Sequence, residues 1–275
     1  MLNKTISGTL NLEGGYLKYE MAGEGIPLIL SHAAFLDSRM FDGIWEPLAQ
    51  TFRVIRYDMR GFGQSSDVHG PLARRDDLAR LLKHLDISRA HLVGCSNGGE
   101  LMLDLVLEQP DLAESLTLVD STPGGFETQG EPPRYMNEMF DALKTGDIKR
   151  GNELQIRIWI DSEFREPDQV DPALREKALA MNYLPVSRKT FMIADMQPLN
   201  PLDPPAVTRL GEVGCPTLVV VGALDNPEIL RAAEMMSQEI PNARKVIMEG
   251  TGHVPSYEQP EKFVTYLLEF LHALI

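Results

Sequence analysis

A short glycine-rich motif is the strongest chemical signal in the sequence. It joins an apolar, strand-like run to a helical pattern, and it reads Gly94-Cys95-Ser96-Asn97-Gly98. A sharp strand-to-helix turn pushes the serine backbone into strained dihedral angles, and the flanking glycines leave room for neighbouring backbone. The hydroxyl then projects at the N-terminus of a helix, where the dipole favours developing negative charge. Ser96 is therefore predicted to be a nucleophile, the alternative being a tight turn with an incidental serine.

A nucleophilic serine needs a base, and the base needs an acid that orients it. His253 follows the last predicted strand, in the loop Glu249-Gly250-Thr251-Gly252-His253. Asp225 follows the strand before it, in Gly222-Ala223-Leu224-Asp225. Sites in open α/β sheets form at the carboxyl ends of parallel strands, where both residues are expected. Asp120, which ends an earlier strand, is the competing acid, and Asp225 is preferred; the alternative role for either carboxylate is a helix or turn cap.

The elements that must position these residues alternate along the chain. Two alternating stretches, residues 8–12 and 16–21, flank Gly14-Gly15 and predict a hairpin. Further strands are predicted from apolar runs at residues 26–30, 52–57, 91–95, 116–119, 216–221 and 243–248. Helices are predicted at residues 38–50, 72–85, 98–109, 228–240 and 261–275. The alternation predicts an α/β fold, with a mostly parallel central sheet and helices on both faces.

One long segment interrupts this alternation. Residues 122–209 contain no strand-like run, and helical patterns occur at residues 135–143, 151–160, 172–181 and 187–196. We therefore expect a helical cap over residues 122–209, inserted into a core made of residues 1–121 and 210–275. The segment is rich in methionine, whose flexible thioether suits either an adaptable substrate pocket or the cap's own core.

The composition excludes several classes of protein. A hydrophobic content of 43% and a charged content of 24% are those of a folded globular chain rather than a disordered one. The formal charge of -14 argues against nucleic-acid and anionic-membrane partners. Cys95 and Cys215 are too few for a disulfide scaffold and are expected to be buried free thiols. The first residues carry no apolar signal-like stretch, and no run is long enough to cross a bilayer, so we expect a cytoplasmic protein.

Together these segments resemble the α/β-hydrolase superfamily, and in particular its capped esterase and lactonase-like branch. The resemblance spans nearly the whole chain and rests on five motifs in one order. These are His32-Ala33-Ala34, Asp58-Met59-Arg60-Gly61-Phe62-Gly63-Gln64-Ser65, Gly94-Cys95-Ser96-Asn97-Gly98-Gly99, Gly222-Ala223-Leu224-Asp225 and Gly252-His253. The chain order Ser, Asp, His is the one this fold uses. The superfamily's haloalkane dehalogenases and epoxide hydrolases carry an aspartate where this chain has Ser96.

The resemblance also implies roles for the loop after residues 26–30. One oxyanion donor is the Asn97 amide, and the second is implied to be the amide of Ala34, with Phe35 as the alternative. The family commonly has His-Gly where this chain has His32-Ala33, and alanine narrows the backbone freedom there. His32 and Arg60 are implied to hold loops in place rather than to touch substrate.

The sequence therefore predicts a serine hydrolase that cleaves small to medium carboxylic esters through an acyl-enzyme, without a cofactor or a metal. An enol-lactone hydrolase, a carbon–carbon bond hydrolase and a cofactor-free perhydrolase use the same three residues and stay open. A hydrolase-like receptor or scaffold is the non-enzymatic alternative. The partner is then a small-molecule ester or lactone, and a homodimer is open. The residues predicted to line the pocket are apolar and large: Phe35, Met40, Trp45, Met136, Met139, Trp159 and Met192.

Overall fold

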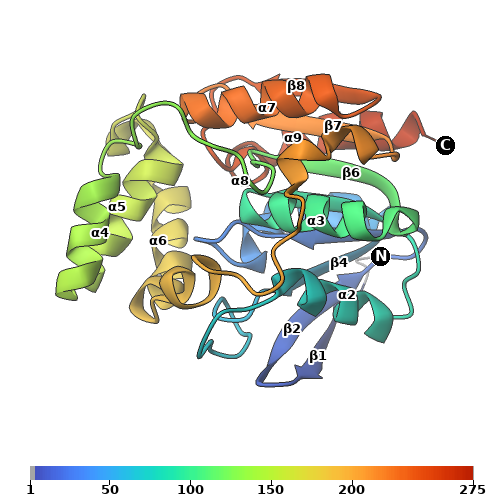
Figure 1. Cartoon of the computed structure of the whole chain (residues 1–275), viewed down its shortest axis with the longest axis horizontal. Coiled ribbons are helices and arrows are strands. Elements are labelled where there is room, and N and C mark those ends of the chain that lie inside the picture. Colours follow the sequence, from blue (N-terminus) through green and yellow to red (C-terminus); the bar gives the residue numbers. More distant parts are fainter. Residues whose placement is uncertain (1–3, 275) are drawn as a thin grey trace.

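A twisted central sheet organises the chain, and the computed structural model describes residues 4–274 of it (Figure 1). Within these residues the sheet has eight strands in the order β1-β2-β4-β3-β5-β6-β7-β8. The strands are β1 Ile6–Leu12, β2 Gly15–Ala22, β3 Pro27–Ser31, β4 Arg53–Asp58, β5 Ala90–Cys95, β6 Ala113–Val119, β7 Thr217–Gly222 and β8 Ala243–Met248. The predicted hairpin is confirmed, because β1 pairs antiparallel with β2 across the turn at Gly14.

From β4 onward the sheet is parallel, as predicted. β2 pairs antiparallel with β4. Each further neighbouring pair is parallel, in the spatial order β4, β3, β5, β6, β7 and β8. β5 and β7 are buried along their whole length, which explains their unbroken apolar runs. All the parallel strands end at one edge of the sheet, where the loops after β3, β5, β6, β7 and β8 meet.

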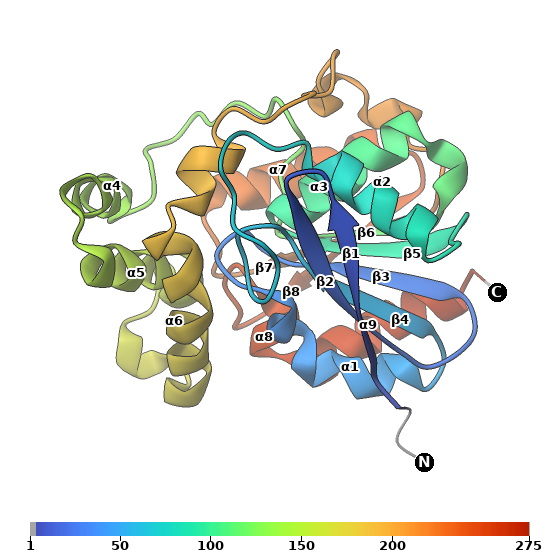
Figure 2. The same ribbon diagram turned by 90° about the horizontal axis from the view of Figure 1, so that it is seen from below.

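Helices cover both faces of the sheet (Figure 2). α2 Arg74–His84, α3 Asn97–Glu108 and α7 Pro227–Glu239 contribute to the apolar core on one face. α1 Asp42–Ala49 and α9 Pro260–His272 contribute to the core on the other face, and the short α8 Pro255–Glu258 precedes α9. The predicted α/β fold with a covered parallel sheet is thereby confirmed. No helix of residues 4–274 has the length and apolar character that a membrane span needs.

The segment between β6 and β7 forms a helical layer beside the sheet. It contains α4 Met136–Thr145, α5 Ile148–Ile156 and α6 Pro172–Ser187, which cluster on the left of Figure 1. Its helices share a small core of their own: Met139, Ala142, Leu143, Leu154, Ile158 and Val186. The inner side of α5 and α6 continues the core beneath α1 and α9, through Ile156, Ile160 and Met181.

Several predicted helices differ in detail from the structure; the pattern at residues 151–160, for example, is divided into α5 and a π-helical turn, Arg157–Asp161. The pattern at residues 38–50 is divided into a 3-10 turn, Ser38–Phe41, and then α1, because Asp37 caps Arg39 N–H and starts the turn early. The pattern at residues 187–196 is divided because α6 runs on to Ser187, after which Phe191–Asp195 forms a separate π-helical turn. The helix predicted to reach Ile275 ends at His272, and Ile275 itself lies outside the described residues.

A buried ion pair ties the β6–β7 segment to α8 and, through Glu258, to the loop after β8. Arg165 donates to Glu258 Oε2 at 2.7 Å, and both side chains are almost fully buried. The same guanidinium also donates to the carbonyl of Ile160, at 2.6 Å. Glu258 Oε1 accepts from Gly252 N–H at 2.8 Å, directly before His253. Burial raises the pKa of Glu258, so Arg165 is the charge that compensates this carboxylate.

Gly94→Ala should destabilise the protein strongly, because a Cβ at this position would collide with the backbone of Gly98 and Gly99. Neither backbone can move without disturbing β5 or α3, so we expect a loss of about 3 kcal/mol or more in unfolding free energy. Gly214→Ala is the matched control, since nothing lies within 4 Å of its added Cβ. Denaturant unfolding measures both variants, and equal stability of the two would contradict the steric argument.

Arg165→Ala should cost about 3–5 kcal/mol of stability, because it leaves the buried Glu258 carboxylate without its cation. Arg150→Ala removes a comparable but exposed pair, with Glu138, and should cost at most about 1 kcal/mol. Thermal and denaturant unfolding of both variants measure the difference. A loss for Arg165→Ala no larger than that for Arg150→Ala would show that the buried pair is not the tie inferred here.

Candidate active site

Ser96 occupies a strained turn between β5 and α3. Its backbone has φ 54° and ψ -123°, a conformation that a non-glycine residue adopts only when its surroundings enforce it. A Cβ at Gly98 would collide with the carbonyls of Ser31 and His32, so a side chain there would push α3 away from the loop after β3. The hydroxyl of Ser96 is thereby held at the N-terminus of α3, above the carboxyl edge of the sheet.

The three residues expected to act together form one hydrogen-bonded chain. Ser96 Oγ lies 2.9 Å from His253 Nε2, and His253 Nδ1 lies 2.7 Å from Asp225 Oδ2. The side chains of His253 and Asp225 are almost completely buried. Because the Nδ1–H donates to the carboxylate, Nε2 is left to accept from the serine hydroxyl. The residues come from the loops after β5, β7 and β8, which neighbouring parallel strands bring to one place.

Asp120, the competing acid, lies close to this chain but has a different partner. Its Oδ1 accepts from Gly222 N–H at 2.9 Å, and its Oδ2 is buried without a hydrogen-bond partner. Burial, and after it the negative charge of Asp225, raises the pKa of Asp120 well above its ordinary value. The geometry therefore leaves the contact with His253 to Asp225, because Asp120 is bound to Gly222 N–H instead.

Polar atoms of Asp120, Asp225 and His253 lie within 4.8 Å of one another, a spacing that a metal ion also accepts. However, both ring nitrogens of His253 already have partners in Asp225 and Ser96. A histidine without a free lone pair is a poor metal ligand, so these residues fit a hydrogen-bonded catalytic arrangement better than a metal site.

Backbone amides face the position where an oxyanion would form. Among residues 4–274, the Asn97 amide and the amides of Ala34 and Phe35 make no hydrogen bond with the protein. Both Ala34 and Phe35 also line the pocket above Ser96, so either amide is available as the second donor. Ala33 is fully buried and its φ is not positive, so alanine is accommodated where the family commonly has glycine.

The loop after β3 is held from behind by polar contacts. His32 Nε2 accepts from Met59 N–H at 2.9 Å, while its Nδ1 donates to the Ala33 carbonyl at 2.9 Å. Arg60 binds Asp77 with two hydrogen bonds, of 2.7 and 2.8 Å. These contacts are consistent with the loop-holding roles predicted for His32 and Arg60.

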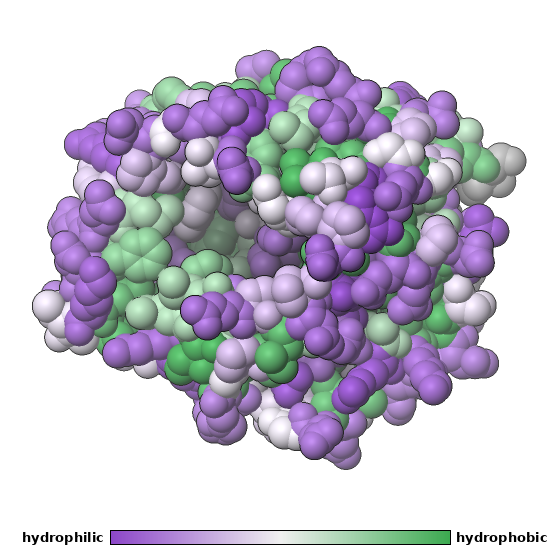
Figure 3. Space-filling model, viewed as in Figure 1, coloured by the Kyte–Doolittle hydropathy of each residue, from purple (hydrophilic) through white to green (hydrophobic). Residues whose placement is uncertain are grey.

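A cavity of about 560 Å³ opens above Ser96 and His253, between the sheet edge and the β6–β7 segment. The face shown in Figure 3 is hollowed between these two parts of the molecule. Phe35, Met136, Met139 and Trp159 line the cavity, as expected. The Trp159 ring lies over His253, with 4.5 Å between the ring centroids.

Three predicted pocket residues lie elsewhere. Met192 lines a small neighbouring cavity instead, whereas Phe191, the residue before it, lines both cavities; adjacent side chains of a helical turn point in different directions. Met40 and Trp45 are core residues packed between the sheet and α9. The Met40 sulfur accepts from Ala33 N–H at 3.5 Å, so this side chain supports the loop from below.

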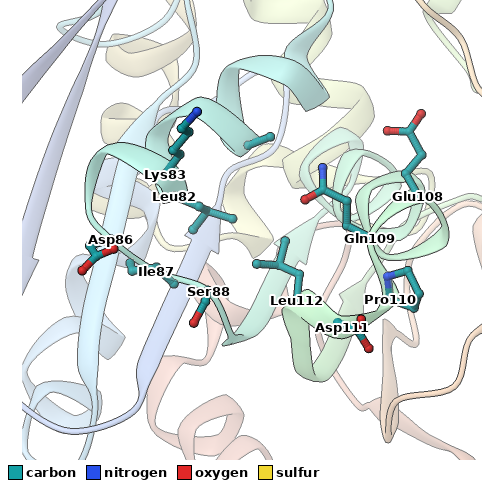
Figure 4. A pocket seen from close by; sticks show the side chains of 11 residues that line it. Leu82, Lys83, Asp86, Ile87, Ser88, Glu108, Gln109, Pro110, Asp111 and Leu112 are labelled. Carbon is teal, nitrogen blue, oxygen red and sulfur yellow. The ribbon is translucent and has the colours of Figure 1, made fainter.

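A separate hollow of about 530 Å³ lies between the ends of α2 and α3 (Figure 4). Its walls include Lys83, Asp86, Glu108 and Leu112, next to the amino ends of β5 and β6. This is the opposite edge of the sheet from Ser96, so the hollow has no part in the chemistry of the hydroxyl.

Sequence reasoning missed the supporting roles of two acidic residues. Asp58 accepts from Ser38 N–H at 2.9 Å and from Gln64 N–H at 2.7 Å, which ties the loop after β3 to the loop after β4. Glu258 holds Gly252 beside His253. Asp58 belongs to the motif Asp58–Ser65, so the sequence could have indicated its role. The partners of Glu258 depend on contacts between distant segments, which the sequence does not show.

The chain has clear relatives among characterised proteins. The family model described as alpha/beta hydrolase fold matches residues 26–260. A pimeloyl-[acyl-carrier protein] methyl ester esterase of Nitrosomonas europaea is 27% identical, over 90% of this chain and 96% of its own length. The 3-oxoadipate enol-lactonase 1 of Acinetobacter baylyi is 26% identical, over 96% of both chains.

A solved structure is similar over nearly the whole length of the chain as well. A thermophilic esterase from Thermogutta terrifontis superposes with a TM-score of 0.76 at 27% identity, covering 98% of this chain and 99% of that one. The family model matches well over half of the chain, in agreement with the parallel sheet and the strained serine turn. This chain therefore belongs to the alpha/beta hydrolase fold family.

Proposed function

We propose that this chain is a serine hydrolase that cleaves carboxylic esters of small to medium size through an acyl-enzyme. The observation that carries the proposal is the unbroken chain from Ser96 Oγ through His253 to Asp225, which opens into an apolar cavity. Such a chain activates a hydroxyl that is otherwise a weak nucleophile. Cys95, the neighbouring thiol, is buried, and burial raises its pKa well above the ordinary value, so it does not compete as nucleophile.

The reaction follows from the geometry in two acyl transfers. His253 Nε2 takes the proton of Ser96 as the hydroxyl oxygen attacks the ester carbonyl carbon. The Asn97 amide and an amide of the loop after β3 stabilise the oxyanion, and the ester C–O bond then breaks. The leaving alcohol takes the proton from His253. Water repeats the sequence on the acyl-enzyme, releases the acid and restores Ser96, while Asp225 holds the imidazole tautomer throughout.

In this proposal, residues 122–209 act as a cap over a core of residues 1–121 and 210–275. The cap supplies Trp159, Met136 and Met139 to the cavity, and its Trp159 shields His253 from water. Exclusion of water strengthens the electrostatic interactions of the site and lets the cap select the substrate. The segment has a small hydrophobic core of its own, which is consistent with a cap that packs as one body.

The relatives are consistent with ester chemistry, since the similar proteins include a methyl ester esterase, a thermophilic esterase and an enol-lactonase. An enol-lactone is a cyclic ester, so the same attack opens it, and it is the second substrate class to test. The cytoplasmic location and the homodimer stay predictions from the sequence.

Hydrolysis of p-nitrophenyl esters from acetate through dodecanoate tests the proposal. We expect the rate to peak at one chain length, set by the cavity, and Ser96→Ala to lower kcat by about 10⁴-fold or more. A fluorophosphonate should label the wild-type protein and not Ser96→Ala. Labelling without ester hydrolysis would direct the search to lactones and diketones, whereas neither labelling nor turnover would overturn the proposed nucleophile.

The acid is tested by comparing Asp225→Asn with Asp120→Asn on the preferred ester. Asp225→Asn should lower kcat by about 10⁴-fold, because an amide favours the wrong imidazole tautomer. Asp120→Asn keeps an acceptor for Gly222 N–H and should cost much less. A larger loss for Asp120→Asn than for Asp225→Asn would reverse the assignment of the acid.

A further inference from the structure

A second cavity adjoins the one above Ser96. It has a volume of about 460 Å³ and lies between α3, the start of α2 and residues 191–206. Asn97, Glu100 and Phe191 line both cavities, so these three side chains form the wall between them. In Figure 1 the chain after the π-helical turn runs across α3, and its residues 198–202 and 205–206 line this cavity. A substrate bound at Ser96 therefore meets the wall as soon as it extends along α3.

The wall carries hydrogen-bond acceptors that lack donors. Glu100 makes no side-chain hydrogen bond or ion pair with any part of residues 4–274. Asn97 Oδ1 and Asp104 Oδ1 are buried and also without a partner. These residues follow one another at helical spacing, so they lie on one face of α3. The site where a Cβ of Gly124 would lie is 3.6 Å from Glu100 Oε1 and 3.5 Å from Asp104 Oδ1, so both carboxylates converge on a single open point.

Nearby cations do not compensate Glu100. Arg74 is paired with Asp195, and Arg75 is paired with both Glu108 and Asp104. Burial, and after it the negative charges of Asp104 and Asp195, raises the pKa of Glu100 to about 7. The cavity above Ser96 adds no positive charge, because its described lining residues include no lysine or arginine. Besides Glu100, its lining includes three carboxylic side chains: Asp120, Glu131 and Glu228.

We infer that three residues on this face of α3, Asn97, Glu100 and Asp104, bind a protonated amine carried by the ester substrate, with Glu100 as its charged partner. A primary ammonium group supplies three donors and one positive charge, which match the unpaired acceptors and the excess of negative charge. Glu100 lies one helical turn beyond Ser96, about 6 Å along the helix axis, a span that about four to five carbon atoms bridge. The inference rests on the proposed ester hydrolysis and names its substrate class: esters whose acyl or alcohol part ends in an amine.

Paired esters that differ only in a terminal ammonium or methyl group test this inference. Aminobutyl hexanoate is compared with pentyl hexanoate, and methyl ω-aminohexanoate with methyl heptanoate, so the amine lies on the alcohol side or on the acyl side. At about pH 8 the Glu100 carboxyl is mainly ionised and the amine still protonated. We expect kcat/KM of the ammonium ester to exceed that of its methyl partner by about tenfold in at least one pair.

Glu100→Gln should bring this ratio close to one, because the amide keeps the size of the side chain and removes its charge. Glu269→Gln is the matched control: it makes the same chemical change at an exposed position of α9, and the ratio should stay that of the wild type. A wild-type ratio of one or less in both pairs, or a high ratio that survives Glu100→Gln, would overturn the inference.

Binding separates this inference from the proposed reaction. In Ser96→Ala protein the esters bind without turnover, and calorimetry should give a Kd for the preferred ammonium ester that weakens by about tenfold on adding Glu100→Gln. Such a loss supports the amine site even if no ester is hydrolysed, in which case the proposed reaction alone fails. An unchanged Kd rejects the amine site, even if the hydrolysis of neutral esters is rapid.

Discussion

The close crossing of β5, α3 and the loop after β3 is the constraint on which the rest of the structure depends. Ser96 can hold a strained backbone only because Gly94 and Gly98 let neighbouring chains approach where any Cβ would collide. The strain is balanced by the fully buried β5 on one side of the turn and the largely buried α3 on the other. The turn aims one hydroxyl at the carboxyl edge of the sheet, and it also leaves the first amides of α3 without acceptors, so the proposed nucleophile and the proposed oxyanion donor have one origin.

Carboxylates are placed around this turn with three different physical roles. Asp225 contacts His253 and makes the anionic end of the hydrogen-bonded chain. Asp120 and Glu258 accept hydrogen bonds from backbone amides nearby. Asp120 thereby fixes the end of β7, and Glu258 fixes the loop after β8. Glu100 differs from all of these, because it lines the cavities and has no partner within the described part of the chain. Glu100 is therefore the carboxylate beside the site whose charge is left for a ligand to compensate, as proposed above.

The β6–β7 segment is joined to the sheet by packing and by a few buried ion pairs. Arg165 binds Glu258 of α8, which holds the loop that carries His253. Arg74 and Arg75 hold the π-helical turn and the chain after it against α2. A displacement of the segment would therefore disturb both the imidazole and the wall at Glu100. The position of the β6–β7 segment and the geometry of His253 are therefore coupled.

The sequence by itself determined the α/β alternation, the serine turn and the candidates for base and acid, because these depend on local periodicity and on glycine sterics within a few residues. Only the tertiary structure decided which carboxylate contacts His253, since Asp120 and Asp225 both follow strands that end beside it. It also decided that Met136 and Met139 face the cavity whereas Met192 does not, because the π-helical turn redirects the chain there. Glu100 had no signal in the sequence, because an unpaired carboxylate is recognised only when all of its neighbours are placed.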